Sequence, residues 1–151
     1  MNYILDTNIV LIYVRDTEFT RKLESKINLL EPTNNLVLSV VSIGEIRSIG
    51  KQNKWGKKRM KRLSEILDRF LIADINVEEI VEMYAEIDTY SQGKLEEKTT
   101  KLSSRNMGKN DIWIAATASV LNLELITTDG DFNHLDGEYL KLKKIDQAKI
   151  I

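Results

Sequence analysis

The sequence of 151 residues contains no cysteine, one proline and a single histidine, His134. Without cysteine, disulfide frameworks and thiolate metal sites are both excluded. With only one histidine, a metal site must be built mainly from oxygen ligands, which select hard cations such as Mg²⁺, Mn²⁺ or Ca²⁺ over zinc or copper. One proline and seven glycines leave no room for a long linker. We therefore expect a single domain over residues 1–151.

Long apolar runs and a strong net charge are also lacking. No apolar run approaches the roughly 18–20 residues that cross a bilayer. The formal net charge is −1, so the chain as a whole shows no excess of positive charge for nucleic-acid binding. We expect no membrane segment, and a soluble protein located in the cytoplasm.

Short apolar segments alternate with helical patterns along the chain. Segments 2–5, 36–40, 124–128 and 138–145 are predicted to be strands, whereas segments such as 57–70 have apolar residues three or four apart, as helices do. This alternation predicts an α/β fold with a central parallel sheet of four to five strands and helices on both faces. In such a sheet the carboxyl ends of the strands share one edge, where ligands bind.

Five acidic residues follow this pattern. Asp6 ends the first predicted strand, and Glu45 lies in the helix after the second. Asp111 starts the helix that leads into the third strand, and Asp129 and Asp131 follow that strand in "TTDGDF". If the sheet is parallel, all five carboxylates can converge at its carboxyl edge.

Each acid also has a simple structural explanation. Asp6 is an equally good helix N-cap, "SIGE" at 42–45 forms a capping box through Glu45, and Asp111 is favoured at a helix start. The "DGD" sequence is typical of turns. Together they are harder to explain, because carboxylates about 5 Å apart repel by about 3 kcal/mol per pair at an effective dielectric constant near 20. Such a cluster must hold protons, spread apart or bind a cation. Carboxylate-bound Mg²⁺ or Mn²⁺ favours phosphodiester hydrolysis, with phosphoryl transfer as an alternative.

Four segments resemble the successive motifs of PIN-domain ribonucleases: "ILDTN", "SVVSIGEI", "GKNDIWIAATA" and "LITTDGDF". Within that family, the size and the "NDIWIAA" phrase are most similar to VapC-type toxins of type II toxin–antitoxin pairs. The resemblance implies a parallel sheet between helices and Mg²⁺- or Mn²⁺-dependent cleavage of RNA. It also implies a small antitoxin partner and a homodimer.

The resemblance further implies that Asp6, Glu45, Asp111 and Asp129 are the catalytic, metal-binding acids. The residues themselves favour Asp6 and Asp111 for the principal cation, with Glu45 and Asp129 completing the shell or positioning the attacking water. Asp131 is a further candidate ligand. The supporting positions, which would orient the first and last acids or contact a phosphate, are Thr7, Asn8, Thr127 and Thr128.

The segment 51–62 has seven lysines or arginines in twelve positions, with Trp55 among them. These cations would neutralise RNA phosphates, and Trp55 would stack on a base. A partner surface and a plain solvated helix face are the alternatives. The candidate substrate contacts are Arg47, Lys51, Lys54, Trp55, Lys57, Lys58 and Arg59. We expect His134 in a surface turn rather than as a general base, and Trp113 in the core or a dimer contact.

The sequence therefore predicts a metal-dependent endoribonuclease that acts as a toxin, with a housekeeping RNA-processing nuclease of the same family as the alternative. A phosphoryl-transfer protein is a second hypothesis, but the aspartate phosphatase pattern requires a second aspartate two positions after the first, where this chain has Asn8. A third is a non-catalytic module that binds RNA or protein.

Overall fold

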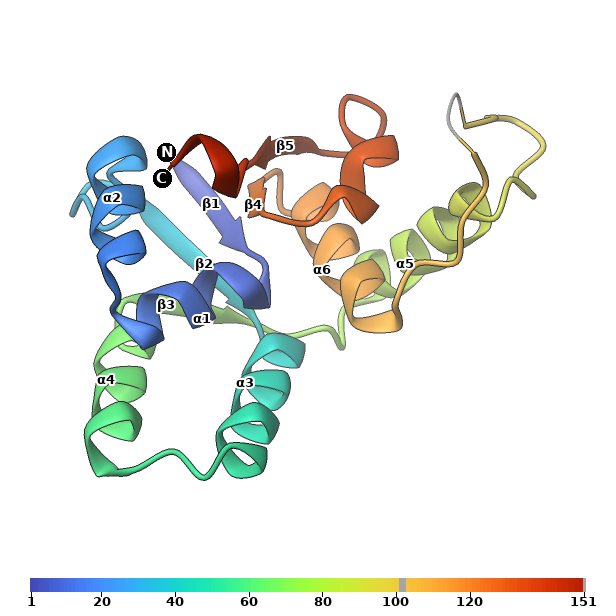
Figure 1. The fold of residues 1–151 in the computed structure, drawn as a ribbon. Helices are drawn as coiled ribbons and strands as arrows, with labels where there is room; N and C mark the ends of the chain where they lie inside the picture. The colour runs from blue at the N-terminus through green and yellow to red at the C-terminus, as the bar shows by residue number, and fades with distance from the viewer. Residues whose placement is uncertain (101–102, 151) are drawn as a thin grey trace.

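A computed structural model describes residues 1–100 and 103–150. Its centre is one sheet of five parallel strands in the order β3–β2–β1–β4–β5 (Figure 1). The strands are β1 (Asn2–Leu5), β2 (Asn35–Ser39), β3 (Phe70–Ala73), β4 (Glu124–Thr127) and β5 (Lys141–Lys144). The helices are α1 (Thr7–Arg15), α2 (Glu18–Ile27), α3 (Val40–Gln52), α4 (Lys57–Leu67), α5 (Glu78–Ser91) and α6 (Lys109–Val120), with short 3-10 helices η1 (Gly130–Leu135) and η2 (Gln147–Lys149). The α/β fold with a parallel sheet is confirmed.

The central strand β1 is apolar on both faces, and helices cover the sheet on each side and bury it. Tyr3 and Leu5 point into a core shared with α1, α2 and α4, whereas Ile4 points into a second core shared with α5 and α6. Successive side chains of a strand alternate between faces, so one short apolar run serves both cores. Helix α1 is apolar almost all round and buried from Ile9 to Val14.

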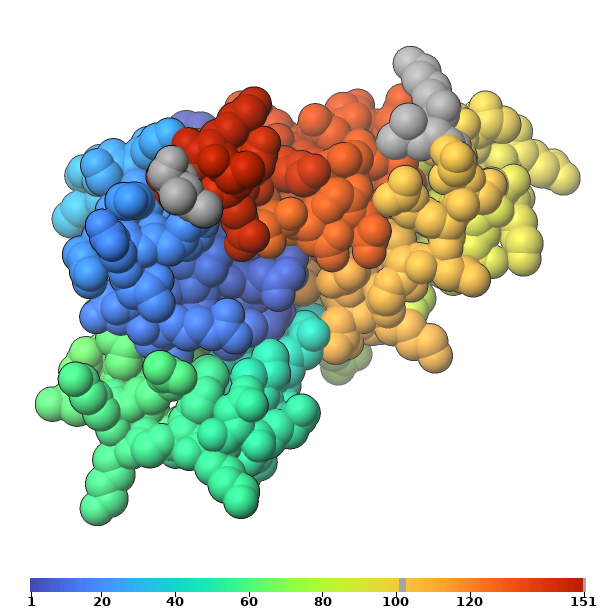
Figure 2. Space-filling view, viewed as in Figure 1, coloured from blue at the N-terminus to red at the C-terminus, as the bar shows by residue number. Residues whose placement is uncertain are grey.

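The chain reverses its direction of travel across the sheet at β1. From β1 it adds β2 and β3 on one side, then crosses to β4 and β5 on the other. Ligands of open parallel sheets bind outside the carboxyl ends of the strands at such a reversal. In Figure 2 the segment that contains α3 and α4 projects from the rest of the molecule.

Strand β3 is absent from the four strands that the sequence predicts. The helical spacing predicts one helix over residues 57–70, but α4 ends at Leu67 and Phe70 begins β3. Phe70 continues the helical spacing by chance, three positions after Leu67. The strand is short and lies at the sheet edge with Leu71 and Ile72 exposed, so it shows no buried apolar pattern.

The boundary between β2 and α3 also differs from the prediction. The strand ends at Ser39 rather than residue 40, and Ser39 is the N-cap of α3, where its hydroxyl accepts a hydrogen bond from the Val41 amide. Glu45 therefore lies in the second turn of α3. The predicted capping box between Ser42 and Glu45 is wrong, so Glu45 is free of that structural role.

No helix in the described ranges is both long and apolar enough to cross a membrane. Trp113, expected in the core or a dimer contact, is half-buried and packs on Tyr84 of α5 with ring centroids 4.2 Å apart. The contact joins the two helices of the second core.

The burial of β2 gives a direct test of the fold. Leu38 is fully buried, so Leu38→Ala should lower the free energy of unfolding by about 2–5 kcal/mol. Leu71 is 67% exposed on β3, and Leu71→Ala should change it by less than about 0.5 kcal/mol. Urea denaturation in the presence of a chelator measures both, and equal losses would contradict the strand assignments.

Candidate metal centre

Asp6 is held at the carboxyl end of β1, where only 3% of it is exposed. It occupies the N-cap position of α1, yet its side chain makes no capping hydrogen bond. Instead its Oδ2 accepts a hydrogen bond of 2.7 Å from the Thr127 hydroxyl. Burial raises the pKa of the Asp6 carboxyl, and the hydrogen bonds from Thr127 and from the Thr7 amide oppose that shift. Asp6 is therefore the N-cap residue of α1, as its position suggests, but no capping hydrogen bond accounts for its carboxylate.

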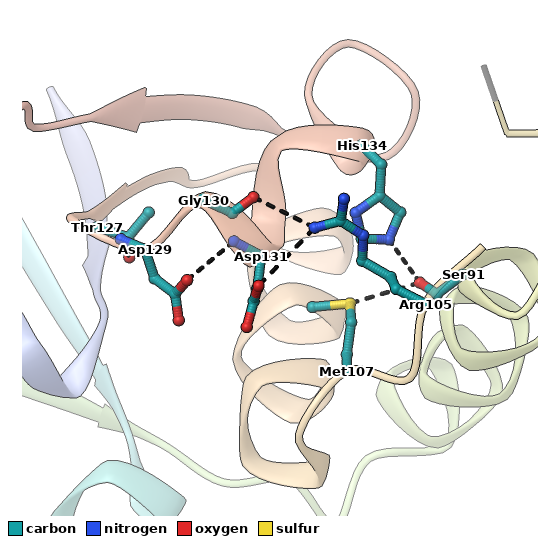
Figure 3. Close-up of polar contacts among 8 residues, drawn as sticks. All are labelled: Ser91, Arg105, Met107, Thr127, Asp129, Gly130, Asp131 and His134. Atoms are coloured by element: carbon teal, nitrogen blue, oxygen red, sulfur yellow. Dashed lines mark hydrogen bonds and ion pairs between the residues drawn. The ribbon is translucent and has the colours of Figure 1, made fainter. Parts of the chain in front are cut away.

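Thr127, the last residue of β4, connects Asp6 to the next acid. Its hydroxyl accepts a hydrogen bond of 2.9 Å from the Asp129 amide. The Asp129 Oδ1 in turn accepts a hydrogen bond of 2.9 Å from the Asp131 amide at the start of η1 (Figure 3). The segment "TTDGD" is thus a turn, as its composition predicts, and the turn places the Asp129 carboxylate near Asp6.

Glu45 is fixed by side chains from two helices. The Thr7 hydroxyl of α1 lies 2.9 Å from Glu45 Oε1 and 3.0 Å from the Ser42 hydroxyl. Ser42 is fully buried and Glu45 half-buried. Thr7 therefore supports the second acid through its hydroxyl and the first only through its amide. Ser42, which the sequence suggests only as a helix cap, is a member of the site that sequence reasoning missed.

Asp111, in the first turn of α6, completes the group. Oxygens of Asp111, Asp129 and Asp131 all lie within 4.8 Å of one another. Burial raises the pKa of Asp111 to about 7, with further contributions from Asp6, Asp129, Glu45 and Asp131 in that order. The other four predicted acids therefore all lie near enough to Asp111, at the carboxyl edge of the sheet, to affect its charge.

This donor set fits a divalent cation. It offers carboxylate oxygens, which hard cations prefer. Two neighbouring carboxylates at 4.8 Å repel by about 3 kcal/mol at an effective dielectric constant near 20, and a cation between them removes this repulsion. Burial is the largest cause of the raised pKa of Asp111, and repulsion from the neighbouring carboxylates adds to it in the metal-free chain.

Two of the predicted supporting residues lie elsewhere. Asn8 is exposed on α1. Thr128 is half-buried and lines a separate hollow of about 460 Å³ with Lys144 and Asp146. Of the predicted pair Thr127 and Thr128, the structure brings only Thr127 into contact with the acids.

The prediction for His134 is wrong, because this residue is buried rather than in a surface turn. It is 5% exposed in η1, and its Nε2 lies 2.7 Å from the hydroxyl of Ser91 at the end of α5 (Figure 3). Burial lowers the pKa of His134, and the nearby Arg105 lowers it further. Arg105 has no distinguishing signal in the sequence, because its segment, 91–110, has charges of both signs.

The basic segment 51–62 lies at the far end of α1 from Asp6. With residues of α1 it surrounds a pocket of about 480 Å³ that contains five cationic side chains and one acid, Asp16. Helix α1 has nine residues, so about 14 Å separate its two ends. Trp55 lines the pocket and packs on Gly50, with the Arg59 guanidinium 5.8 Å from its ring centroid. Arg47 is exposed two positions after Glu45, and such residues do not share a helix face.

Sheet order, acid positions and sequence together define the class of protein. A family model of the PIN domain matches residues 3–138. The chain therefore belongs to the PIN-domain family, and the resemblance of its four motifs is confirmed.

Two relatives within this family are VapC-type proteins. The chain is 30% identical over 129 residues to Ribonuclease VapC1 of Haemophilus influenzae strain R2866, an alignment that covers 84% of this chain and 86% of the relative. Ribonuclease VapC1 of strain 86-028NP matches to the same extent.

Solved structures share the fold. VapBC2 from Rickettsia felis, bound to a promoter DNA fragment, has a TM-score of 0.74 at 24% identity and covers 97% of this chain and 100% of its own. FitAcB from Neisseria gonorrhoeae has a TM-score of 0.69 at 25% identity, with 94% and 96% covered. VapBC-1 from nontypeable Haemophilus influenzae has a TM-score of 0.70 at 23% identity and covers 95% of this chain and 98% of its own.

The carboxylate repulsion predicts that Asp111→Asn stabilises the metal-free protein. The folded pKa of Asp111, about 7, lies above the unfolded value near 4, so the folded state binds more protons between these pH values and loses stability as pH rises through them. Asparagine does not ionise. In thermal unfolding with a chelator, Asp111→Asn should raise the Tm at pH 8 and leave it nearly unchanged at pH 4. Glu65→Gln, at an exposed position of α4, is the control, and a variant no more stable than the parent at pH 8 would contradict the prediction.

Proposed function

We propose that this protein is an endoribonuclease that depends on Mg²⁺ or Mn²⁺ and acts as the toxin of a toxin–antitoxin pair. The observation that supports this most directly is the group of five carboxylates at the carboxyl edge of the sheet, in a chain that belongs to the PIN-domain family. The relative named Ribonuclease VapC1 supports RNA as the substrate.

Each acid has a role that follows from its surroundings. Asp6, Asp111 and Asp129 would hold the cation, because they come from three different segments and their charges act on one another. Glu45, kept in place by the Thr7 hydroxyl, orients the attacking water. When bound, a divalent cation makes water more acidic and offsets negative charge on phosphate oxygens. Thr127 keeps Asp6 and Asp129 in a fixed relation while substrate exchanges.

The cationic pocket beside α4 would contact RNA away from the bond that is cleaved. Lys54, Lys58 and Arg59 line it, with Lys51 and Lys57 on the same basic segment. Phosphate contacts of this kind give affinity without reading sequence. Trp55 would contact the RNA through the part of its ring that lines the pocket.

The partners follow from the relatives. Solved structures with this fold include VapBC2 and VapBC-1, so an antitoxin is the proposed protein partner, and a homodimer is proposed on the family resemblance. An RNA-cleaving toxin would act in the cytoplasm, where its substrate is.

The acidic group predicts the loss of activity when a ligand is neutralised. Asp6→Asn and Asp111→Asn should each reduce RNA cleavage by at least about 100-fold and abolish growth arrest on expression, because each removes a proposed ligand. Glu65→Gln should retain both activities. Cleavage in the presence of Mn²⁺ and of a chelator, with circular dichroism to verify folding, tests this. Unchanged cleavage in both aspartate variants would contradict the site, and cleavage without growth arrest would favour a housekeeping nuclease.

The basic segment predicts a change in substrate binding alone. The double variant Lys57→Ala/Lys58→Ala should raise KM for single-stranded RNA while kcat stays constant, since these lysines bind the ground and transition states equally. The slope of log K against log salt should become shallower by about 0.7 for each phosphate that is no longer neutralised. The control is the double variant Lys22→Ala/Lys141→Ala, which removes two lysines that pair with Glu18 and Glu124 elsewhere on the surface and should leave KM unchanged. Equal effects of both double variants would refute the specific role of this segment.

A further inference from the structure

We propose that Arg105 is a positioning residue that holds Asp131 within the carboxylate group, so that Asp131 becomes a cation ligand together with Asp111 and Asp129. The inference rests on the proposed function, because it assigns a role at the same site. It concerns the one acid whose part in the site the sequence leaves open.

The contacts of Arg105 converge on the turn that contains the last two acids. Its Nη1 lies 3.8 Å from Asp131 Oδ1 and donates to the Gly130 carbonyl at 3.4 Å (Figure 3). Gly130 lies between Asp129 and Asp131, so one guanidinium contacts both the backbone and the side chain of this turn. Among the described residues, this is the one ion pair made by any of the five acids.

The backbone of Arg105 is itself fixed. Its amide donates a hydrogen bond of 2.7 Å to the Ser91 carbonyl at the end of α5. The Ser91 hydroxyl lies 2.7 Å from His134 Nε2 in η1, and it also contacts Met107 Sδ at 3.4 Å. Ser91 therefore ties the Arg105 backbone and η1 to the same helix end, and the Arg105 side chain is 30% exposed.

Asp131 needs such a partner because its own surroundings favour movement away from its neighbours. Its side chain is 61% exposed and can rotate into water. One carboxylate oxygen of Asp111 and one of Asp129 lie within 4.8 Å of an Asp131 oxygen, and these like charges repel it. An ion pair with Arg105 opposes this repulsion and engages one carboxylate oxygen, leaving the second for a cation.

A second cation near the same turn provides a matched control. A Cβ built on Gly130 would lie 3.5 Å from Lys144 Nζ, so Lys144 is also next to the turn. Among the described residues, it makes no ion pair with Asp131. If nearby positive charge acted only by repelling the bound cation, removing either residue would tighten cation binding. If Arg105 positions Asp131, removing it weakens cation binding, which is the opposite sign.

Isothermal titration of Mn²⁺ into the full chain tests the proposal. Arg105→Ala and Asp131→Asn should each weaken binding about tenfold, as expected for loss of a residue that orients a ligand. Lys144→Ala should not weaken it. The double variant Arg105→Ala/Asp131→Asn should bind no more weakly than Asp131→Asn alone, because Arg105 acts through Asp131. Arg105→Gln keeps most of the side-chain stem and should weaken Mn²⁺ binding as Arg105→Ala does. If the alanine variant does not unfold cooperatively, the glutamine variant is used in its place.

The outcomes separate this inference from the proposed function. Unchanged or tighter Mn²⁺ binding in the Arg105 variants, with normal binding by the unsubstituted chain, would overturn the positioning role alone. Multiplicative losses in the double variant would also overturn it, because Arg105 would then act independently of Asp131. Absence of Mn²⁺ binding by the unsubstituted chain would overturn both the proposed function and this inference.

Discussion

The hydroxyl of Thr127 is the contact on which the acidic group depends. It donates to Asp6 and accepts from the Asp129 amide, and a hydroxyl can do both at once, unlike a methyl or an ammonium group. Strand pairing places it there: Leu5 pairs with Ile126, and the Asp6 amide donates to the Ile126 carbonyl at 3.0 Å. The residues after both strands therefore leave the sheet side by side. Since β1 and β4 meet at the reversal of strand order, two acids distant in sequence become neighbours.

The acids around this hydroxyl lower the local stability of the metal-free fold. Two carboxylates are buried or half-buried at one edge beside other acids, and burial first, then repulsion by those acids, raises the pKa values of Asp6 and Asp111. Two apolar cores, one on each face of the sheet, hold the strands in register against that repulsion. Functional sites commonly break local rules that the surrounding fold compensates. Here the compensation is visible in β1, which is buried on both faces directly before Asp6.

The parallel sheet could be predicted from the sequence, because buried parallel strands are apolar throughout, and the approach of Asp6 and Asp129 follows from the pairing of the strands that precede them. The strand β3 could not be predicted, since Phe70 extends the spacing of α4 and an exposed edge strand has no pattern of its own. The burial of His134 depends on Ser91, 43 positions away, and no local signal reports such a contact. The capping box of Glu45 failed because Ser39 starts the helix three residues earlier than Ser42. Arg105 was missed for the same reason as His134: its role comes from a turn 25 residues further on.

The distribution of positive charge completes the physical picture. At the acidic group, five carboxylates face one paired guanidinium, so the metal-free edge repels a polyanion. The five cations of the pocket beside α4 lie at the other end of α1, where they would attract phosphates without pairing with the five carboxylates. If the same cations stood at the acidic edge, they would neutralise the carboxylates and compete with a divalent ion for them. The cationic pocket and the acidic group are separated by the length of one buried helix, α1, which is apolar along most of its length. This separation would let the protein attract RNA at one end of α1 and bind a cation at the other.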